Sequence, residues 1–305
     1  MTGDEGEPAV RTEGLAKHYG DVTALDDLSL TVPRGELFGF LGPNGAGKST
    51  TINILTGQLV PDEGTAEVVG IDPVAEPVRA REAVGILPEN GRPPSFLTVR
   101  EYFEFVAATR DLDDGTVQPR VDAWADRLEF EHKLDTLCTD LSQGERQKVL
   151  ITQAFLHEPD VVFIDEPLTN LDPIMQERVK RFFREYRADG NTLFLSTHFI
   201  GTAEEVCTQV GIINRGRLLA EIDPRELGAE ESLLDRFFAA VDADSKEGAV
   251  IGEGLATDAA DPAAMAEEEA VEAETDGGEA SDARRGSSGR RSDDGETGLG
   301  GTEDR

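Results

Sequence analysis

The residues with the clearest chemistry lie at positions 42–50, in the sequence GPNGAGKST. They follow the apolar run ELFGF and open the helical pattern STTINILTG, which is the strand, turn and helix context of a phosphate-binding loop. Glycines let successive backbone N–H groups point at phosphate oxygens, Lys48 adds positive charge, and Ser49 offers a hydroxyl to magnesium. The predicted nucleotide-binding residues are Gly42, Asn44, Gly45, Ala46, Gly47, Lys48, Ser49 and Thr50.

Two acids end a second apolar run, VVFIDEPL at 161–168. Asp165 is placed to hold magnesium through water, and Glu166 can polarise an attacking water molecule. An unpaired carboxylate is costly to bury, so a structural role alone does not explain two acids at this position. Together with the phosphate-binding loop, the pair indicates a site that hydrolyses ATP with magnesium.

The stretch LSQGE at 141–145 predicts the start of another helix. Ser142 and Glu145 have the spacing of a capping box, in which the hydroxyl and the carboxylate each bind a backbone N–H group. A helix N-terminus also attracts anions, so a purely structural cap and a second phosphate contact are both open at this point.

Short apolar runs alternate with helical patterns before and after these motifs. Runs of this kind predict an α/β fold with a mainly parallel sheet covered on both faces. Two segments depart from the alternation. The runs AVRTEGLAKHY and ALDDLSLTV indicate an antiparallel flank, and residues from about 95 to 157 have only helical patterns.

The ordered set GPNGAGKST, LSQGE, VVFIDEP, LTNLDP and STH resembles the nucleotide-binding domain of the ABC ATPases, over residues 8 to about 225. The resemblance implies a P-loop NTPase fold in which 95–157 is the helical signature subdomain. It also implies that ATP and Mg²⁺ are the cofactors, that Lys48 and Glu166 are catalytic, and that Ser142 and Gly144 contact ATP held by a second ATP-binding subunit.

Further site residues follow from the same resemblance. Tyr19 matches the aromatic residue that stacks on adenine, although an ordinary half-buried tyrosine is the alternative. Asp172 matches the acid that links the two active sites of a dimer. His198 matches a catalytic histidine that contacts the γ-phosphate and orients Glu166, whereas a lone histidine elsewhere is often structural.

Two positions depart from the family pattern. Glu89, in GILPENGRPP, stands where the family usually has glutamine, and Glu145 replaces the final glutamine of the signature. A carboxylate at 89 can still reach magnesium or the attacking water, so Glu89 joins Ser49 and Asp165 as a predicted metal-site residue. The LPE variant and a C-terminal extension resemble exporters of the ABC-2 type.

Composition restricts the partners. A formal net charge of −33 over 305 residues makes direct binding to nucleic acid or anionic lipid unfavourable, so we expect neither a nucleic acid partner nor a lipid anchor. The acidic composition resembles that of halophile proteins. An ordinary acidic protein is the alternative. Cys138 and Cys207 lack metal-site spacing and are predicted to be packing residues.

The function expected from these features is the ATP-hydrolysing subunit of a transporter, held at the cytoplasmic face of the membrane by a separate transmembrane permease. No run of about 18 uncharged apolar residues is present to cross the membrane in this chain. A non-transport ABC ATPase acting in DNA repair or on ribosomes is the alternative, and the lack of an NKxD-like motif argues against a GTPase.

The end of the chain changes in character. Residues 226–240 are expected to form a short helical extension, and 241–305 to form a disordered acidic tail because they carry few large apolar residues.

Overall fold

A computed structural model of the chain describes residues 7–228 and 231–253. The described residues up to Val250 belong to one compact unit, which holds every site discussed below. Within the described residues, no helix is long and apolar enough to cross a membrane.

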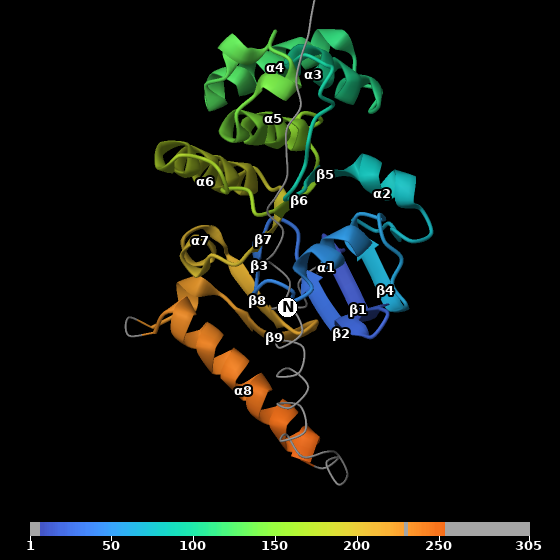
Figure 1. The fold of residues 1–305 in the computed structure, drawn as a ribbon, viewed down its shortest axis with the longest axis vertical. Coiled ribbons are helices and arrows are strands. Elements are labelled where there is room, and N and C mark those ends of the chain that lie inside the picture. Colours follow the sequence, from blue (N-terminus) through green and yellow to red (C-terminus); the bar gives the residue numbers. More distant parts are fainter. Residues whose placement is uncertain (1–6, 229–230, 254–305) are drawn as a thin grey trace, which may run out of the picture. The chain divides into compact units, whose positions relative to one another are not determined.

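The main sheet has six strands in the order β5, β6, β7, β3, β8 and β9 (Figure 1). Their bounds are β3 Leu37–Leu41, β5 Val84–Leu87, β6 Val161–Asp165, β7 Thr192–Thr197, β8 Gln209–Asn214 and β9 Arg217–Ile222. The first five strands of this order are parallel and β9 is antiparallel to β8. All residues of β3, β6 and β7 are buried, as expected for parallel strands covered on both faces. The predicted α/β class is confirmed.

Helices lie between these strands along the chain. α1 Lys48–Leu55 follows β3, α2 Pro77–Ala83 precedes β5, α6 Pro173–Ala188 connects β6 with β7, and α7 Ile200–Val206 connects β7 with β8. The last strand pair is instead a hairpin, since Arg215 and Gly216 both have positive φ angles of 48° and 79° and reverse the chain between β8 and β9.

A second sheet of three antiparallel strands forms the predicted flank. Its order is β2 Val22–Val32, β1 Val10–Tyr19 and β4 Glu63–Val68. A hydrophobic cluster joins the two sheets, in which Leu15 and Leu28 of the flank share a core with Phe38, Phe163 and other residues of the main sheet. This packing sets the N-terminal strands against the loop that follows β3.

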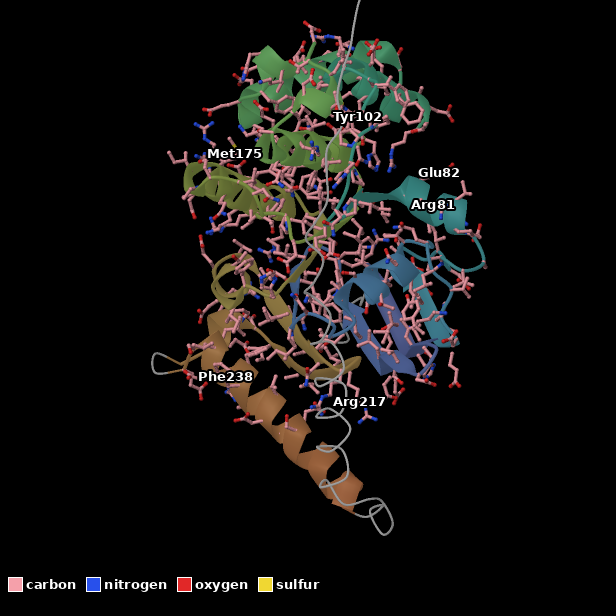
Figure 2. The ribbon with its side chains drawn as sticks, viewed as in Figure 1. Arg81, Glu82, Tyr102, Met175, Arg217 and Phe238 are labelled. Atoms are coloured by element: carbon pink, nitrogen blue, oxygen red, sulfur yellow. The ribbon has the colours of Figure 1, made fainter. Side chains whose placement is uncertain are left out.

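The predicted helical subdomain is present. It contains α3 Val99–Ala108, α4 Asp114–Leu128 and α5 Gln143–Phe155, with short 3₁₀ turns at Glu131–Lys133 and Cys138–Asp140. Figure 1 shows α3 and α4 gathered over α5, away from the antiparallel sheet. Tyr102, labelled in Figure 2, and Phe103 are buried, whereas Phe96 and Phe105 are 77% and 54% exposed. Of these four aromatic residues, Tyr102 and Phe103 therefore belong to the core of the subdomain, and Phe96 and Phe105 lie at its surface.

Both cysteines are buried, in agreement with the packing role predicted for them. The thiol of Cys207 occupies space beside Gly39, where a Cβ atom would lie 2.7 Å from its Sγ atom. Cys138 lies in the core of the helical subdomain.

The C-terminal helix starts and ends later than the sequence predicted. The helix expected over 226–240 is α8, Leu233–Glu253, so the prediction of disorder from residue 241 is wrong as far as 253. Leu233 is fully buried, Phe237 packs on the main core, and Asn214 donates to Asp244 at 2.9 Å. Once the first turn of a helix is anchored, each further residue adds a hydrogen bond at little cost, which carries α8 through a polar sequence. The rest of the predicted tail, 254–305, lies outside the described residues.

Candidate active site

The loop between β3 and α1 curls around an open centre. Gly47, which precedes α1, has a φ of 107°, and Gly45 has a φ of 79°. A Cβ atom on Gly47 would lie 2.6 Å from the carbonyl oxygen of Ala24, so only glycine fits there. The loop therefore presents its backbone N–H groups and the N-terminus of α1 to one space, which is an arrangement that binds phosphate.

Lys48 bends back over this loop. Its Nζ atom donates to the carbonyl oxygens of Gly42 at 2.7 Å and Pro43 at 3.1 Å, and the side chain is buried. Burial lowers the pKa of the Lys48 ammonium group, while the nearby charges of Glu166 and Asp165 raise it. The ammonium group thus lies where an incoming phosphate can replace the loop carbonyls as its partner.

Asp165 ends β6 between two hydroxyl groups. Ser49 of α1 donates to its Oδ2 atom at 2.7 Å, and Ser196 of β7 donates to its Oδ1 atom. Parallel pairing of β6 with β7 sets Asp165 directly beside Ser196. The carboxylate is consequently held in one orientation, facing the phosphate-binding loop.

Glu166 follows in a turn with a positive φ of 50°, and it is only 7% exposed. Its Oε1 atom accepts from the backbone N–H of His198 at 2.9 Å and lies 2.6 Å from the Nδ1 atom of the same residue. Its Oε2 atom accepts a longer bond of 3.3 Å from Thr197. A non-glycine residue in this backbone region is strained, and such strain is common where a side chain is held for function.

The two oxygens of Glu166 therefore differ. Oε1 is held twice by His198, while Oε2 has one weak partner and is the better placed to accept a proton. The contact at Oε1 also requires a proton on Nδ1 of His198, so in a neutral imidazole Nε2 is the acceptor nitrogen.

These residues line one cavity of about 510 Å³. Its predicted members are Tyr19, Asn44, Gly45, Gly47, Lys48, Ser49, Thr50, Glu89, Asp165, Glu166 and His198. Val22, Thr23 and Ala24 complete the lining. Tyr19 is 51% exposed, more open than a half-buried core residue, which leaves its ring accessible at the edge of the cavity. The other two predicted loop residues support the loop from within: Gly42 donates to Thr197 at 3.3 Å, and Ala46 is buried.

Besides Gly42 and Ala46, three further predicted residues do not line this cavity, namely Ser142, Gly144 and Asp172. Ser142 caps α5, since its hydroxyl accepts from Glu145 N at 3.2 Å and the Glu145 carboxylate accepts from Ser142 N at 2.9 Å. The capping box is thus confirmed, and the bond from the Ser142 backbone is the main cause that lowers the pKa of Glu145. Gly144 lies one residue before Glu145, in the first turn of α5.

Asp172 caps the next helix, because its Oδ1 atom accepts from Ile174 N and Met175 N, both at 3.0 Å. The starts of α5 and α6 are neighbours, since a Cβ atom on Gly144 would lie 3.0 Å from the carbonyl oxygen of Asn170. Within one chain, the structure therefore separates these helix starts from the cavity that holds the phosphate-binding loop.

The donor set fits magnesium. Ser49 and Asp165 offer oxygen ligands 2.7 Å apart beside the loop, and Glu89 lines the same cavity. Among the described residues, no group of three or more His, Cys, Asp or Glu side chains forms a protein-only metal site. Mg²⁺ is usually held by one or two protein ligands together with phosphate and water, so this sparse set suits it.

Ser196 and Thr197 are site residues that were not predicted from the sequence. They hold Asp165 and Glu166 respectively, and both are buried. The available signal was the change from apolar to hydroxyl side chains at the end of the run TLFLST, beside a strand that ends in two acids.

Comparison with known proteins agrees with a nucleotide-binding role for this site. Residues 25–169 match the family model described as ABC transporter. The Nod factor export ATP-binding protein I of Ralstonia nicotianae is 36% identical over 224 residues, which cover 73% of this chain and 70% of that protein. A probable multidrug ABC transporter ATP-binding protein of Escherichia coli is 31% identical, over 76% of this chain and 40% of its own length. A solved ATP-binding subunit of an ABC transporter superposes with a TM-score of 0.70 at 30% identity, covering 76% of this chain and 98% of that one.

Proposed function

Because the chain belongs to the ABC transporter family of ATP-binding proteins, we propose that it hydrolyses ATP to drive export through a separate membrane permease. The observation that carries the proposal is the pairing of Glu166 with His198 beside a complete phosphate-binding loop. Export is favoured because the relatives reported above include proteins named for export and for multidrug transport.

ATP binds with its phosphates on the loop and on Lys48, which exchanges the carbonyls of Gly42 and Pro43 for phosphate oxygens. The accessible ring of Tyr19 stacks on the base. Ser49 and Asp165, with Glu89 nearby, would hold Mg²⁺, which would neutralise charge at the phosphates.

Glu166 then acts as the general base. Its Oε2 atom accepts a proton from water as the water oxygen attacks the γ-phosphorus atom, and ADP leaves with the electrons of the broken P–O bond. His198 keeps Glu166 in position through Oε1. Its Nε2 atom binds the γ-phosphate.

A second ATP-binding subunit completes the site. The N-terminus of α5, with Ser142 and Gly144, lies outside this chain's own phosphate cavity and binds the γ-phosphate held by the partner. Asp172, at the start of the neighbouring helix α6, links the two sites. ATP therefore joins two subunits that are both acidic. The permease holds the two subunits at the membrane and responds when they close on the bound ATP.

The test is Glu166→Gln, with Glu63→Gln as the matched control, because Glu63 is an exposed glutamate at the start of β4. The amide keeps the size of the side chain and loses the proton acceptor, so ATP turnover should fall at least about 100-fold. ATP binding, measured by equilibrium dialysis, should be retained, and Glu63→Gln should match the unmodified protein. Turnover within threefold of the unmodified protein in Glu166→Gln would remove Glu166 from this role.

A further inference from the structure

The end of β1 lies beside the nucleotide cavity and is held by one residue that precedes β4. In Figure 1, β1 lies between β2 and β4. The pairing of β1 with β4 stops where Ala16 faces Glu63. Beyond this point the backbone N–H of Asp62 donates to the carbonyl oxygen of Ala16 at 2.9 Å. The Oδ2 atom of Asp62 accepts from the backbone N–H of His18 at 2.7 Å, so this carboxylate replaces a strand partner for the last residues of β1.

The second oxygen of Asp62 holds Lys17. Its Oδ1 atom accepts from the Nζ atom of Lys17 at 2.8 Å, and the Lys17 side chain is only 14% exposed. The bonds from Lys17 and from the His18 backbone lower the pKa of the Asp62 carboxyl group, which keeps it charged at neutral pH. The imidazole of His18 lies beside the same carboxylate, with Nδ1 3.4 Å from Oδ2. One carboxylate thus fixes both residues that precede Tyr19.

Lys17 in turn lies over the ring of Tyr19. Residues two apart on a strand point to the same face, and the Nζ atom of Lys17 is 5.9 Å from the centroid of the Tyr19 ring. This distance is within the range of a cation–π contact. Tyr19 is 51% exposed and lines the nucleotide cavity. The ammonium group therefore occupies one face of the ring, and the other face is available for a base.

The strand on the other side of β1 gives less support. The pairing of β1 with β2 shifts register between Lys17 and His18, which leaves Ala24 of β2 without a partner in β1. Irregular pairing of this kind interrupts the hydrogen bonds between two strands. The position of Tyr19 therefore depends on the contacts that Asp62 and Lys17 make on the β4 side.

We propose that Lys17 and Asp62 are positioning residues for the nucleotide, because they hold the ring of Tyr19 with one face open to the base. Neither residue lines the nucleotide cavity, so both act through Tyr19. The proposal rests on the stacking role proposed above for Tyr19. It requires that the loss of either residue weakens ATP binding only when the aromatic ring is present.

The test is a double-mutant cycle of Lys17→Met with Tyr19→Ala, in which ATP affinity is measured by equilibrium dialysis. Methionine keeps an unbranched side chain and removes the charge. Lys17→Met should weaken ATP binding about fivefold in the otherwise unmodified chain. Tyr19→Ala should weaken it about tenfold, which is the scale of base stacking on an aromatic ring. Adding Lys17→Met to Tyr19→Ala should change the affinity by less than about twofold.

ATP turnover gives a second readout. Lys17→Met should raise KM for ATP and leave kcat within about twofold, because the phosphate-binding loop and Glu166 are not altered. Lys17→Arg keeps a charge that can pair with Asp62 and lie over the ring, so ATP affinity should stay within about twofold of the unmodified protein. Asp62→Asn loses the charged partner and should weaken binding about threefold, again only when Tyr19 is present.

Lys180→Met is the matched control. The side chain of Lys180 in α6 is 11% exposed, pairs with Glu205 at 2.6 Å and does not line the nucleotide cavity. This variant should bind ATP as the unmodified protein does. Thermal unfolding followed by circular dichroism checks the folding of each variant, and Asp62→Asn takes the place of Lys17→Met in the cycle if Lys17→Met does not fold.

An equal loss of affinity from Lys17→Met with and without Tyr19 would overturn the proposal, because Lys17 would then act on the phosphates through its charge. Unchanged affinity in Lys17→Met, with weaker binding in Tyr19→Ala, would also overturn it. Full ATP binding in Tyr19→Ala would contradict both the stacking role and this proposal, while ATP turnover retained in that variant would leave the proposed hydrolysis standing.

Discussion

Replacing Ser142 with aspartate separates helix capping from phosphate binding. Aspartate caps helices as well as serine does, so Ser142→Asp should change the free energy of unfolding by less than about 0.5 kcal/mol. The new carboxylate would nevertheless lie at the end of α5 that is proposed to meet the γ-phosphate of the partner's ATP. The substitution therefore keeps the capping hydrogen bond of α5, but the start of this helix now repels an anion instead of attracting it.

The size of the effect follows from Coulomb's law. Two unit charges about 4 Å apart repel by about 4 kcal/mol at an effective dielectric constant of about 20, and salt reduces this value. Because about 1.4 kcal/mol corresponds to a factor of ten, we expect ATP turnover to fall at least about 100-fold. ATP binding to the phosphate-binding loop of the same chain should change little.

The chain provides its own control. Thr98 caps α3 with the same capping box, accepting from Glu101 N at 3.2 Å, which equals the distance at Ser142. Thr98 does not line the nucleotide cavity. Thr98→Asp should therefore leave turnover within twofold. The assay is magnesium-dependent phosphate release, paired with urea unfolding of each variant. Full turnover in Ser142→Asp would show that Ser142 is a cap only, and parallel losses in both variants would assign the effect to stability.

Three further outcomes are expected. Glu89→Gln should alter the magnesium dependence of turnover and leave ADP affinity nearly unchanged, whereas identical magnesium titrations would make Glu89 a bystander. Burial and the nearby charge of Arg110 lower the pKa of His157 to about 4, so its folded form favours the neutral imidazole. The contribution of the neutral His157 ring to the free energy of unfolding is complete above the unfolded pKa of about 6.5 and declines as the pH falls toward 4. The His157 ring signals in NMR spectra should therefore show no titration between pH 7 and pH 5. The acidic surface predicts a higher thermal midpoint in 2 M than in 0.1 M KCl, because salt screens like charges; equal midpoints by circular dichroism would contradict this reasoning.

Local features were predictable from sequence because they depend on residues close together in the chain. The capping box at Ser142 and Glu145 needs only a spacing of three residues, and the turn at Gly47 needs a residue without Cβ. The apolar runs of β3, β6 and β7 indicated strands buried on both faces. The order of the motifs along the chain pointed to the family before any tertiary contact was known.

The tertiary structure decided what the strand register and the packing of distant segments control. Parallel pairing of β6 with β7 brings Ser196 to Asp165, and the turn after β7 brings His198 to Glu166, 32 residues away. No short-range pattern specifies such contacts, because they follow from which strands lie side by side in the folded sheet.

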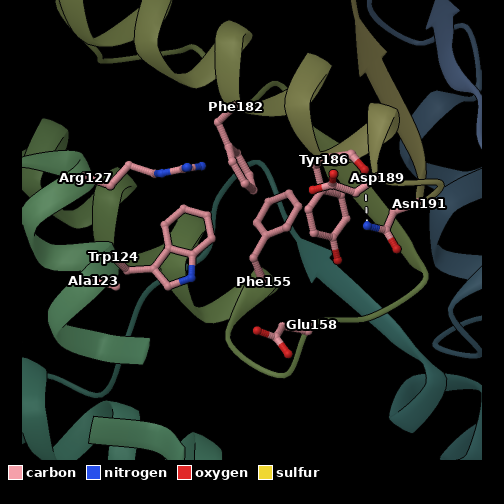
Figure 3. Close-up of a pocket in the computed structure, with 9 residues that line it drawn as sticks. All are labelled: Ala123, Trp124, Arg127, Phe155, Glu158, Phe182, Tyr186, Asp189 and Asn191. Carbon is pink, nitrogen blue, oxygen red and sulfur yellow. Dashed lines mark hydrogen bonds between the residues drawn. The ribbon is translucent and has the colours of Figure 1, made fainter. Parts of the chain in front are cut away.

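The packing of distant segments also explains where predictions from the sequence were wrong and which features they missed. The polar composition after residue 240 suggested disorder, yet Leu233 and Phe237 anchor α8 on the core and the helix continues to Glu253. Trp124 of α4 packs edge to face on Phe182 of α6, with ring centroids 4.7 Å apart (Figure 3). The two residues are far apart in sequence, so only the packing of the helices brings them together. The sequence by itself therefore determined the local chemistry of each motif, and the tertiary structure decided which motifs share a site.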